Sequence, residues 1–419
     1  MQRALTPTRF VSAIAALSLA AACGTASTEP SDQPEAALTS LPRGLTDSER
    51  SVLSAANAFS FSLWKQVNAA TKDSNVFVSP LSVSFSLGMA MNGAANQTLD
   101  EMRSAMQYGS ASLTDIDAGY KSLMSLLASL DNSVTMDVAN SIWYRKDFPF
   151  NQSFLDDGAN FFSASIKPLD FNDAAGSISA INGWVSSRTN GKIPSIVDQI
   201  DPQNVMYLIN AIYFKGSWRT KFDASLTMDA PFHAPGGDQS ARLMHRQGRM
   251  SYMETPGFQA VDLPYGDSAF TMTVMLPKAG STVESLASSL DATVLQSLTT
   301  GLHTAEVELF LPKVKLSFAR NLIPDLESLG MSVPFTDHAD FTRMSTLGRQ
   351  LYISQVRHKT YVDVNEDGTE AAAVTSTGIS VTSAPLYTTM RVDRPFVFVI
   401  RERLSGTVLF IGKVVSVAG

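Results

Sequence analysis

The chain of 419 residues has a single cysteine, Cys23, and only 17% charged residues. One cysteine excludes an intrachain disulfide and a zinc site built from several cysteines, and its place near the N-terminus excludes a thiol nucleophile in a folded body that begins later. Acidic residues outnumber basic ones by 39 to 32, which gives a net charge of −7. Because domains that bind nucleic acid through its phosphates are usually basic, nucleic acid is not an expected partner.

Motifs of the common enzyme classes are also missing. The sequence contains no G-x-S-x-G, H-E-x-x-H, G-x-G-x-x-G or P-loop pattern, and no two of its five histidines stand at a metal-ligand spacing. A Ser-His-Asp triad assembles in space, so spacing alone does not exclude one, but nothing specific supports it. Asp363 to Gly368 matches the first half of an EF-hand loop, yet Val374 stands where the bidentate glutamate is needed. We therefore expect no enzyme, no metal and no cofactor.

No apolar run is long enough for a transmembrane helix. The longest near the N-terminus, Phe10–Ala22, has 13 residues, whereas a membrane span needs about 20. It follows Arg3 and Arg9, and Ala20-x-Ala22 fits a cleavage site, so residues 1–22 are predicted to be a signal peptide. Such a leader indicates export from the cytoplasm.

The residues around Cys23 resemble a bacterial lipobox, in which the cysteine becomes the lipidated first residue, although Ala20 replaces the usual leucine. Residues 23–45 contain three prolines among Ser, Thr, Glu and Asp, which is typical of a flexible linker. We expect a protein anchored by lipid on Cys23 in the cell envelope, at the outer membrane or cell surface. The alternative is a secreted, extracellular protein with an incidental cysteine.

Residues 46–419 are predicted to form one α+β domain, because helical patterns come first and strand patterns later without βαβ alternation. Thr46 and Glu49 form a capping box, and Ser79-Pro80 opens a second helix. A third helix is expected within 182–197. Strands are expected at 205–214, 269–276, 305–316, 352–364, 391–403 and 407–415, where β-branched and aromatic residues are frequent.

One segment is unusual for a loop. Ala371–Met390 contains no charged residue and consists mainly of small or β-branched residues. Long loops without secondary structure are uncommon and are usually functional or disordered, whereas this composition also suits the middle of a sheet. The segment is a candidate switch between loop and strand, or a low-complexity linker.

Motifs along almost the whole body resemble the serpin family, in family order. They are Asn75–Ser82, Asn182–Val185, Thr189–Ile193, Asn210–Trp218 with Phe222, Thr227 and Phe232, Leu263–Tyr265, Leu276-Pro277, Leu311–Lys313, His358-Lys359, Asn365–Ala373, Arg394–Phe396 and Phe410–Val414. The resemblance implies a bacterial serpin: a single domain of about nine helices and three β-sheets, with an exposed reactive-centre loop.

The resemblance also implies a mechanism, suicide inhibition of a serine protease. The protease attacks the loop, and the cleaved loop enters the main sheet before the acyl-enzyme is hydrolysed. A charged or bulky residue would stall this insertion. The hinge in this chain contains no proline and no charge at inward-facing positions, which favours an inhibitor. The expected partner is a serine protease bound covalently, and the protein is expected to be a monomer. The hinge residues are Glu366, Gly368, Thr369, Glu370, Ala371, Ala372 and Ala373.

By the same resemblance, Ser79, Ser82, Asn210 and His358, with Trp218 at the loop entry, make up a cluster that controls opening of the sheet. The reactive bond is less closely defined. Counting from Thr369 places it after Thr382, counting back from Pro395 places it after Ala384, and the loop is two residues longer than usual. The candidates are Val381, Thr382, Ser383 and Ala384. All are small and uncharged, which favours an elastase-like or subtilisin-like target. The alternative is a non-inhibitory, membrane-anchored binding protein with the same fold.

Overall fold

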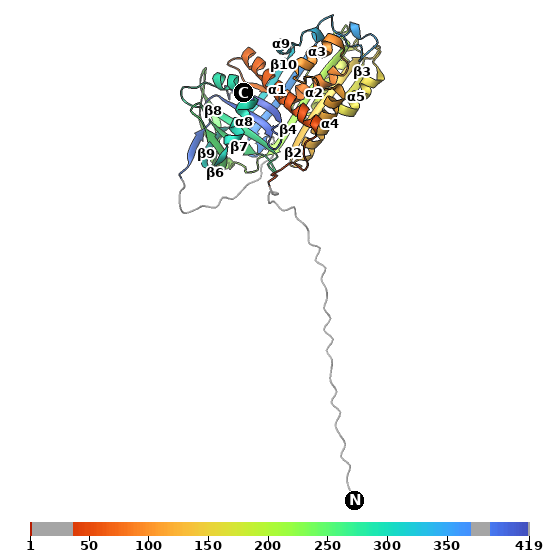
Figure 1. The fold of residues 1–419 in the computed structure, drawn as a ribbon. Helices are drawn as coiled ribbons and strands as arrows, with labels where there is room; N and C mark the ends of the chain where they lie inside the picture. The colour runs from red at the N-terminus through yellow and green to blue at the C-terminus, as the bar shows by residue number, and fades with distance from the viewer. Residues whose placement is uncertain (2–36, 370–385, 418–419) are drawn as a thin grey trace. The chain divides into compact units, whose positions relative to one another are not determined.

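The computed structural model describes residues 1, 37–369 and 386–417 (Figure 1). The described part contains nine α-helices, as expected. They are α1 (Asp47–Ala70), α2 (Pro80–Met91), α3 (Asn96–Ala105), α4 (Leu113–Ser129), α5 (Gln152–Phe162), α6 (Ala174–Arg188), α7 (Val283–Ser289), α8 (Ala292–Gly301) and α9 (Ile323–Glu327). None of these helices combines the length and the apolarity that a membrane span requires.

The strands form two hydrogen-bonded sheets. The larger has the order β1-β15-β14-β8-β7-β6-β9-β13, with β5 paired to β6, and the smaller has the order β10-β11-β12-β4-β2-β3. The strands are β1 (Val76–Val78), β2 (Val134–Arg145), β3 (Ser165–Leu169), β4 (Met206–Ser217), β5 (Met228–Ala234), β6 (Gly237–Glu254), β7 (Phe258–Pro264), β8 (Phe270–Pro277), β9 (His303–Pro312), β10 (Val314–Asn321), β11 (Val356–Asn365), β12 (Gly368-Thr369), β13 (Thr388–Arg391), β14 (Phe396–Glu402) and β15 (Val408–Val414).

The expected third sheet is continuous with the larger one. Strand β6 is 18 residues long and pairs with β5, β7 and β9 along different parts of its length. One long strand therefore carries the hydrogen-bond ladder from one group of strands into the next. The described strands consequently form two sheets rather than three.

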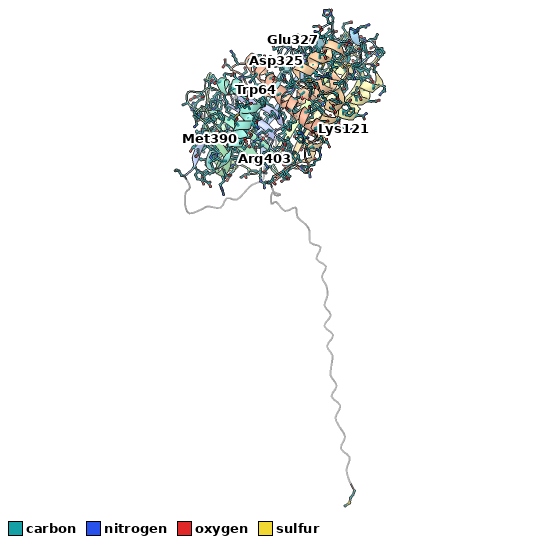
Figure 2. All side chains as sticks on the ribbon, viewed as in Figure 1. Trp64, Lys121, Asp325, Glu327, Met390 and Arg403 are labelled. Atoms are coloured by element: carbon teal, nitrogen blue, oxygen red, sulfur yellow. The ribbon has the colours of Figure 1, made fainter. Side chains whose placement is uncertain are left out.

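Two buried cores surround the smaller sheet. In the main core, α2 packs against both β4 of the smaller sheet and β15 of the larger one, and α1 and α4 pack against α2 (Figure 1). Trp64 (Figure 2) and Phe59 of α1 are fully buried there. On the opposite face, α6 and the segment 193–200 cover Ile209 and Ala211 of β4 in a second core. Because β4 is buried on both faces, its sequence is a nearly continuous apolar run instead of an alternating one.

Local signals located the first two helices correctly. The side chain of Thr46 accepts a hydrogen bond from Glu49 N and that of Glu49 accepts one from Thr46 N, so the expected capping box is confirmed. Helix α2 begins at Pro80 as expected, but Ser79 does not cap it with its side chain. The Ser79 hydroxyl instead donates to the carbonyl of Leu409, 2.8 Å away, because this helix end is buried against β15.

Several expected boundaries were wrong. Helix α6 runs from Ala174 to Arg188, so the helix expected within 182–197 begins earlier, while its end next to Asn190-Gly191 is as expected. The strand expected at 305–316 is two strands, because the chain leaves the larger sheet at Lys313 and enters the smaller one at Val314. The region 391–403 likewise divides into the end of β13 and β14.

The predicted linker 23–45 is too long. Leu38 and Leu41 pack against the main core, and Leu38 N donates to Asp267 O at 2.7 Å. Arg43 forms an ion pair of 2.6 Å with the buried carboxylate of Glu49. The prolines and polar residues suggested a solvated segment, but Leu38, Leu41 and Leu45 pack residues 37–45 against the main core. Cys23 and residues 2–22 lie outside the described residues.

Candidate functional site

The hinge residues lie at the place where two central strands of the smaller sheet diverge. Strands β11 and β4 pair in parallel only through Val356–Lys359 and Leu208–Ala211. Further along, the two-residue strand β12 stands between them. It pairs antiparallel with β11 through Thr369↔Val364 and with β4 through Thr369↔Gly216. The chain therefore already enters the sheet at Thr369.

Gly368 is required by the close approach of β12 to β4. Its φ of 149° is one that L side chains rarely adopt, and a Cβ there would lie 2.1 Å from Gly216 O. Thr369 is 1% exposed, and its Oγ1 lies 2.8 Å from the hydroxyl of Tyr265. The sheet thus holds Gly368 and Thr369 by main-chain pairing, and it holds Thr369 also by one buried side-chain hydrogen bond.

Trp218 belongs to this entry region rather than to the cluster further along the sheet. Its ring stacks on Tyr265 with centroids 4.5 Å apart, and its Nε1 donates to Asn365 O at 2.9 Å. Its backbone N–H donates to Asp367 O at 2.8 Å. Burial raises the pKa of Tyr265 well above its ordinary value, so its hydroxyl stays protonated. The aromatic pair covers the turn that leads into β12.

Glu366 anchors the same turn by its side chain. Its carboxylate accepts hydrogen bonds from Lys313 Nζ at 2.7 Å and from Thr227 Oγ1 at 2.8 Å. Burial alone would raise the pKa of Glu366, but the hydrogen bonds from Lys313, from the backbone and from Thr227 together outweigh it and lower the pKa. The ion pair fixes the turn to Lys313, the residue at which the chain passes between the sheets.

The remaining polar residues of the predicted cluster meet under the parallel part of the β4–β11 pair. The imidazole of His358 accepts at Nε2 from Ser79 N, 3.1 Å away, and Ser82 Oγ donates to Asn210 Oδ1. Burial lowers the pKa of His358 to about 4, which keeps it neutral near pH 7. The structure thus brings together Ser79, Ser82, Asn210 and His358 from α2, β4 and β11.

Sequence reasoning missed one member of this cluster, Asn140 of β2. Its Oδ1 accepts from Asn210 Nδ2 at 2.7 Å and from Ser86 Oγ at 3.2 Å. All three side chains are buried, where polar groups usually have partners within the protein, yet Asn140 Nδ2 has none among the described residues. Asn140 stands in no motif, and only its polarity in an otherwise strand-like stretch could have drawn attention to it. Tyr265 and Lys313 stood in recognised motifs, but their contacts with the hinge were not foreseen.

Several predicted site residues lie outside the described residues. They are Glu370, Ala371, Ala372 and Ala373 of the hinge, the reactive-bond candidates Val381, Thr382, Ser383 and Ala384, and Cys23. The described chain resumes at Leu386, and β13 then pairs in parallel with β9 of the larger sheet. The segment containing the proposed reactive bond therefore connects two different sheets.

Comparisons with known proteins agree with this architecture. Residues 54–417 match the family model described as Serpin (serine protease inhibitor). An uncharacterised serpin-like protein of Thermococcus kodakarensis is 33% identical over 377 residues, which cover 88% of this chain and 86% of that protein. The leukocyte elastase inhibitor of Sus scrofa is 32% identical over 378 residues, 87% of this chain and 99% of that protein.

Two solved structures show the same fold. The thermophilic serpin tengpin in its native state has a TM-score of 0.81 and 31% identity, covering 90% of this chain and 96% of that one. Human thyroxine-binding globulin in complex with thyroxine has a TM-score of 0.82 and 26% identity, covering 89% and 100%. With the family model spanning nearly the whole described body, the chain belongs to the serpin family.

Proposed function

We propose that the chain is a suicide inhibitor of a serine protease, which traps the acyl-enzyme by inserting its cleaved reactive loop into the smaller sheet. The observation that carries this proposal is the position of β12. Gly368 and Thr369 already occupy the space between β11 and β4. Among the described residues, β11 and β4 pair directly with each other through only four residues of each strand. A loop that continued from Thr369 would follow the same path between the strands.

The hinge composition supports insertion. In the sequence Thr369 is followed by Glu370 and then by three alanines. Thr369 faces Tyr265 in the interior, so by strand alternation Glu370 would face the opposite side and Ala371 the interior again. Small side chains enter a packed interior at little steric cost, whereas an unpaired charge costs several kcal/mol.

The target class follows from the uncharged loop. A trypsin-like protease requires Arg or Lys before the scissile bond, and none lies between Ala371 and Met390. The small residues at 381–384 suit an elastase-like or subtilisin-like protease. The named activity of one relative, an inhibitor of leukocyte elastase, is in line with this class.

The test is to incubate the chain from residue 23, carrying Cys23→Ser, with pancreatic elastase and with subtilisin. We expect a complex that survives denaturing electrophoresis and a released C-terminal peptide beginning between Thr382 and Pro385. Heat-inactivated protease is the control. Complete cleavage without a complex by both proteases, together with no rise in thermal stability after cleavage, would contradict the insertion mechanism.

A second candidate is a non-inhibitory binding protein with the same fold, since one structural neighbour was solved with bound thyroxine. The two functions differ in one measurable respect. A binding protein would be cleaved without forming a covalent complex, whereas an inhibitor forms one. The intact hinge favours the inhibitor.

We also propose that the protein is exported and held at the cell envelope through lipid on Cys23, acting there as a monomer. The supporting pattern is the apolar leader that ends at the chain's only cysteine. Growth with radiolabelled palmitate should label the protein, and Cys23→Ser should abolish the label and release the protein into the medium. An unlabelled protein that is nevertheless exported would support the secreted alternative.

A further inference from the structure

A cavity of about 430 Å³ lies between the segment 193–200 and the adjoining ends of β10 and β11. Its lining includes Ala319 and Asn321 of β10, Arg357 and Lys359 of β11, and Ser195 and Asp198 of the covering segment. His358 of the polar cluster also lines the cavity, but the hydrogen bonds described for that cluster and for the hinge involve none of the other lining residues. The cavity therefore needs an explanation of its own.

Strand register places two cations on the cavity side of the sheet. His358 faces α2, where it binds Ser79 N, so its neighbours Arg357 and Lys359 face the opposite side. Asn321 stands directly opposite Arg357, and Ala319 stands opposite Lys359. The small side chain of Ala319 leaves room beside the ammonium group, and Asn321 adds a neutral amide to the same face.

The hydrogen-bonding capacity of these cations is only partly used. Lys359 Nζ donates to Ser195 O at 2.7 Å, and Arg357 Nε donates to Gln355 Oε1 at 2.9 Å. Within 37–369 and 386–417, no carboxylate lies at ion-pair distance from Arg357, whose two Nη groups therefore have no charged partner. Asp198 is the acidic residue that lines the cavity beside them.

Another arginine at the cavity, Arg320, shows how a guanidinium pairs with a carboxylate in this structure. Arg320 contacts Asp325 of α9 in bidentate fashion, with N···O distances of 2.6 and 2.9 Å. Asp325 lies at the α9 end of the body (Figure 2). A guanidinium presents a planar fork that fits carboxylate and phosphate oxygens. Arg320 has such a partner, whereas Arg357 lacks one beside an open cavity.

We propose that this cavity binds a tetrahedral oxyanion of the phosphate or sulfate type. Arg357 supplies the bidentate fork, Lys359 a second positive charge and Asn321 an uncharged amide donor. Charge-assisted hydrogen bonds of this kind are about twice as strong as neutral ones. The volume also leaves space for an organic group on the anion, so a phosphate ester is a second possible source of the same chemistry.

Binding would affect the part of the sheet that has to open for insertion. Arg357 and Lys359 belong to the four residues of β11 that pair in parallel with β4. The covering segment packs through Ile193 and Ile196 on the outer face of β4. An anion between the two like charges would stabilise this closed arrangement by mass action. This consequence rests on the proposed function, whereas binding itself does not.

The experiment is calorimetric titration of the full chain with inorganic phosphate at constant ionic strength, chloride replacing phosphate in the reference. We expect saturable binding of one phosphate per chain and a higher melting temperature in phosphate. Arg357→Gln should weaken binding about tenfold or more, the range expected when a charge-assisted pair is lost. Asp198→Asn should tighten binding, because it removes the negative charge from the lining. Arg249→Gln, an exposed arginine on β6, should leave affinity unchanged.

A parallel titration with glucose 6-phosphate distinguishes the two sources. Equal affinity for both compounds indicates an ester site, and a preference for inorganic phosphate indicates a free-anion site. Each of these results supports the cavity as an oxyanion site. No saturable heat with either compound, or an affinity equal in the wild type, Arg357→Gln and Asp198→Asn, would overturn the proposal. Because Asp198→Asn is expected to act in the opposite direction, a folding defect in the arginine variant cannot imitate the full pattern.

Discussion

Thr369→Arg provides the most direct test of the hinge. Thr369 is 1% exposed, pairs with both Gly216 and Val364, and contacts the hydroxyl of Tyr265. An arginine there would have to bury its guanidinium or force β12 out of the sheet. We expect the variant to be cleaved by the target protease as a substrate and to form little or no covalent complex.

The expected size of the effect follows from the burial. An uncompensated buried charge costs about 3–5 kcal/mol when its partner is missing. Even if only about 1.4 kcal/mol of this cost acts on the barrier to insertion, insertion slows about tenfold. Because insertion competes with hydrolysis of the acyl-enzyme, insertion that is ten times slower raises the ratio of turnover to trapping tenfold.

The assay is the number of inhibitor molecules consumed per protease inactivated, measured by titration and checked on denaturing gels. Thr369→Val is the matched control, because it keeps the shape of threonine and loses only the hydroxyl contact with Tyr265. We expect the valine variant to inhibit much as the wild type does. If the arginine variant inhibited with the same stoichiometry as the valine variant, the reasoning from burial at Thr369 would be refuted.

Three further predictions concern stability, each measured by denaturant unfolding. His358, with its pKa lowered to about 4 by burial, should contribute stability that is complete above pH 6.5 and is lost as the pH falls toward 4, and His358→Gln should flatten that slope. Burial raises the pKa of Asp117 to about 6, so Asp117→Asn should stabilise the protein at pH 8 by about 1–2 kcal/mol, with the gain disappearing by pH 4. An unchanged difference across that range would argue against the Asp117 assignment. Asn140→Ala should cost about 1–3 kcal/mol, because it removes the acceptor of Asn210 and Ser86; no loss would show that these two groups find other partners.

The sequence allowed prediction of features that depend on neighbours along the chain. The capping box at Thr46 and the start of α2 at Pro80 are local, and both were confirmed. The hinge was predicted from its motif, and Gly368 and Thr369 of that motif pair with β11 and β4. These signals work because each depends on a few adjacent residues and a known backbone conformation.

Features that depend on distant contacts were not predictable. The hydroxyl of Tyr265 contacts Thr369 from a turn after β7, and Asn140 of β2 contacts Asn210, its register partner on the neighbouring strand β4. Ser79 could be assigned as a helix cap from its position, but burial against β15 gives its hydroxyl another acceptor, Leu409 O. In each case tertiary packing decided which hydrogen bond formed, and no single segment of sequence contains that information.

The divergence of β11 and β4 determines whether insertion of a strand between them is thermodynamically favourable. Their mutual ladder ends at Lys359 and Ala211, while residues 360–363 and 212–215 pair on their outer sides with β10 and β2. A strand extending β12 between them would replace one short parallel ladder by two antiparallel ones, which are slightly more stable per residue. The sheet would gain more backbone hydrogen bonds than it lost. Insertion would therefore be favoured over its reversal, and each inhibitor molecule would react only once.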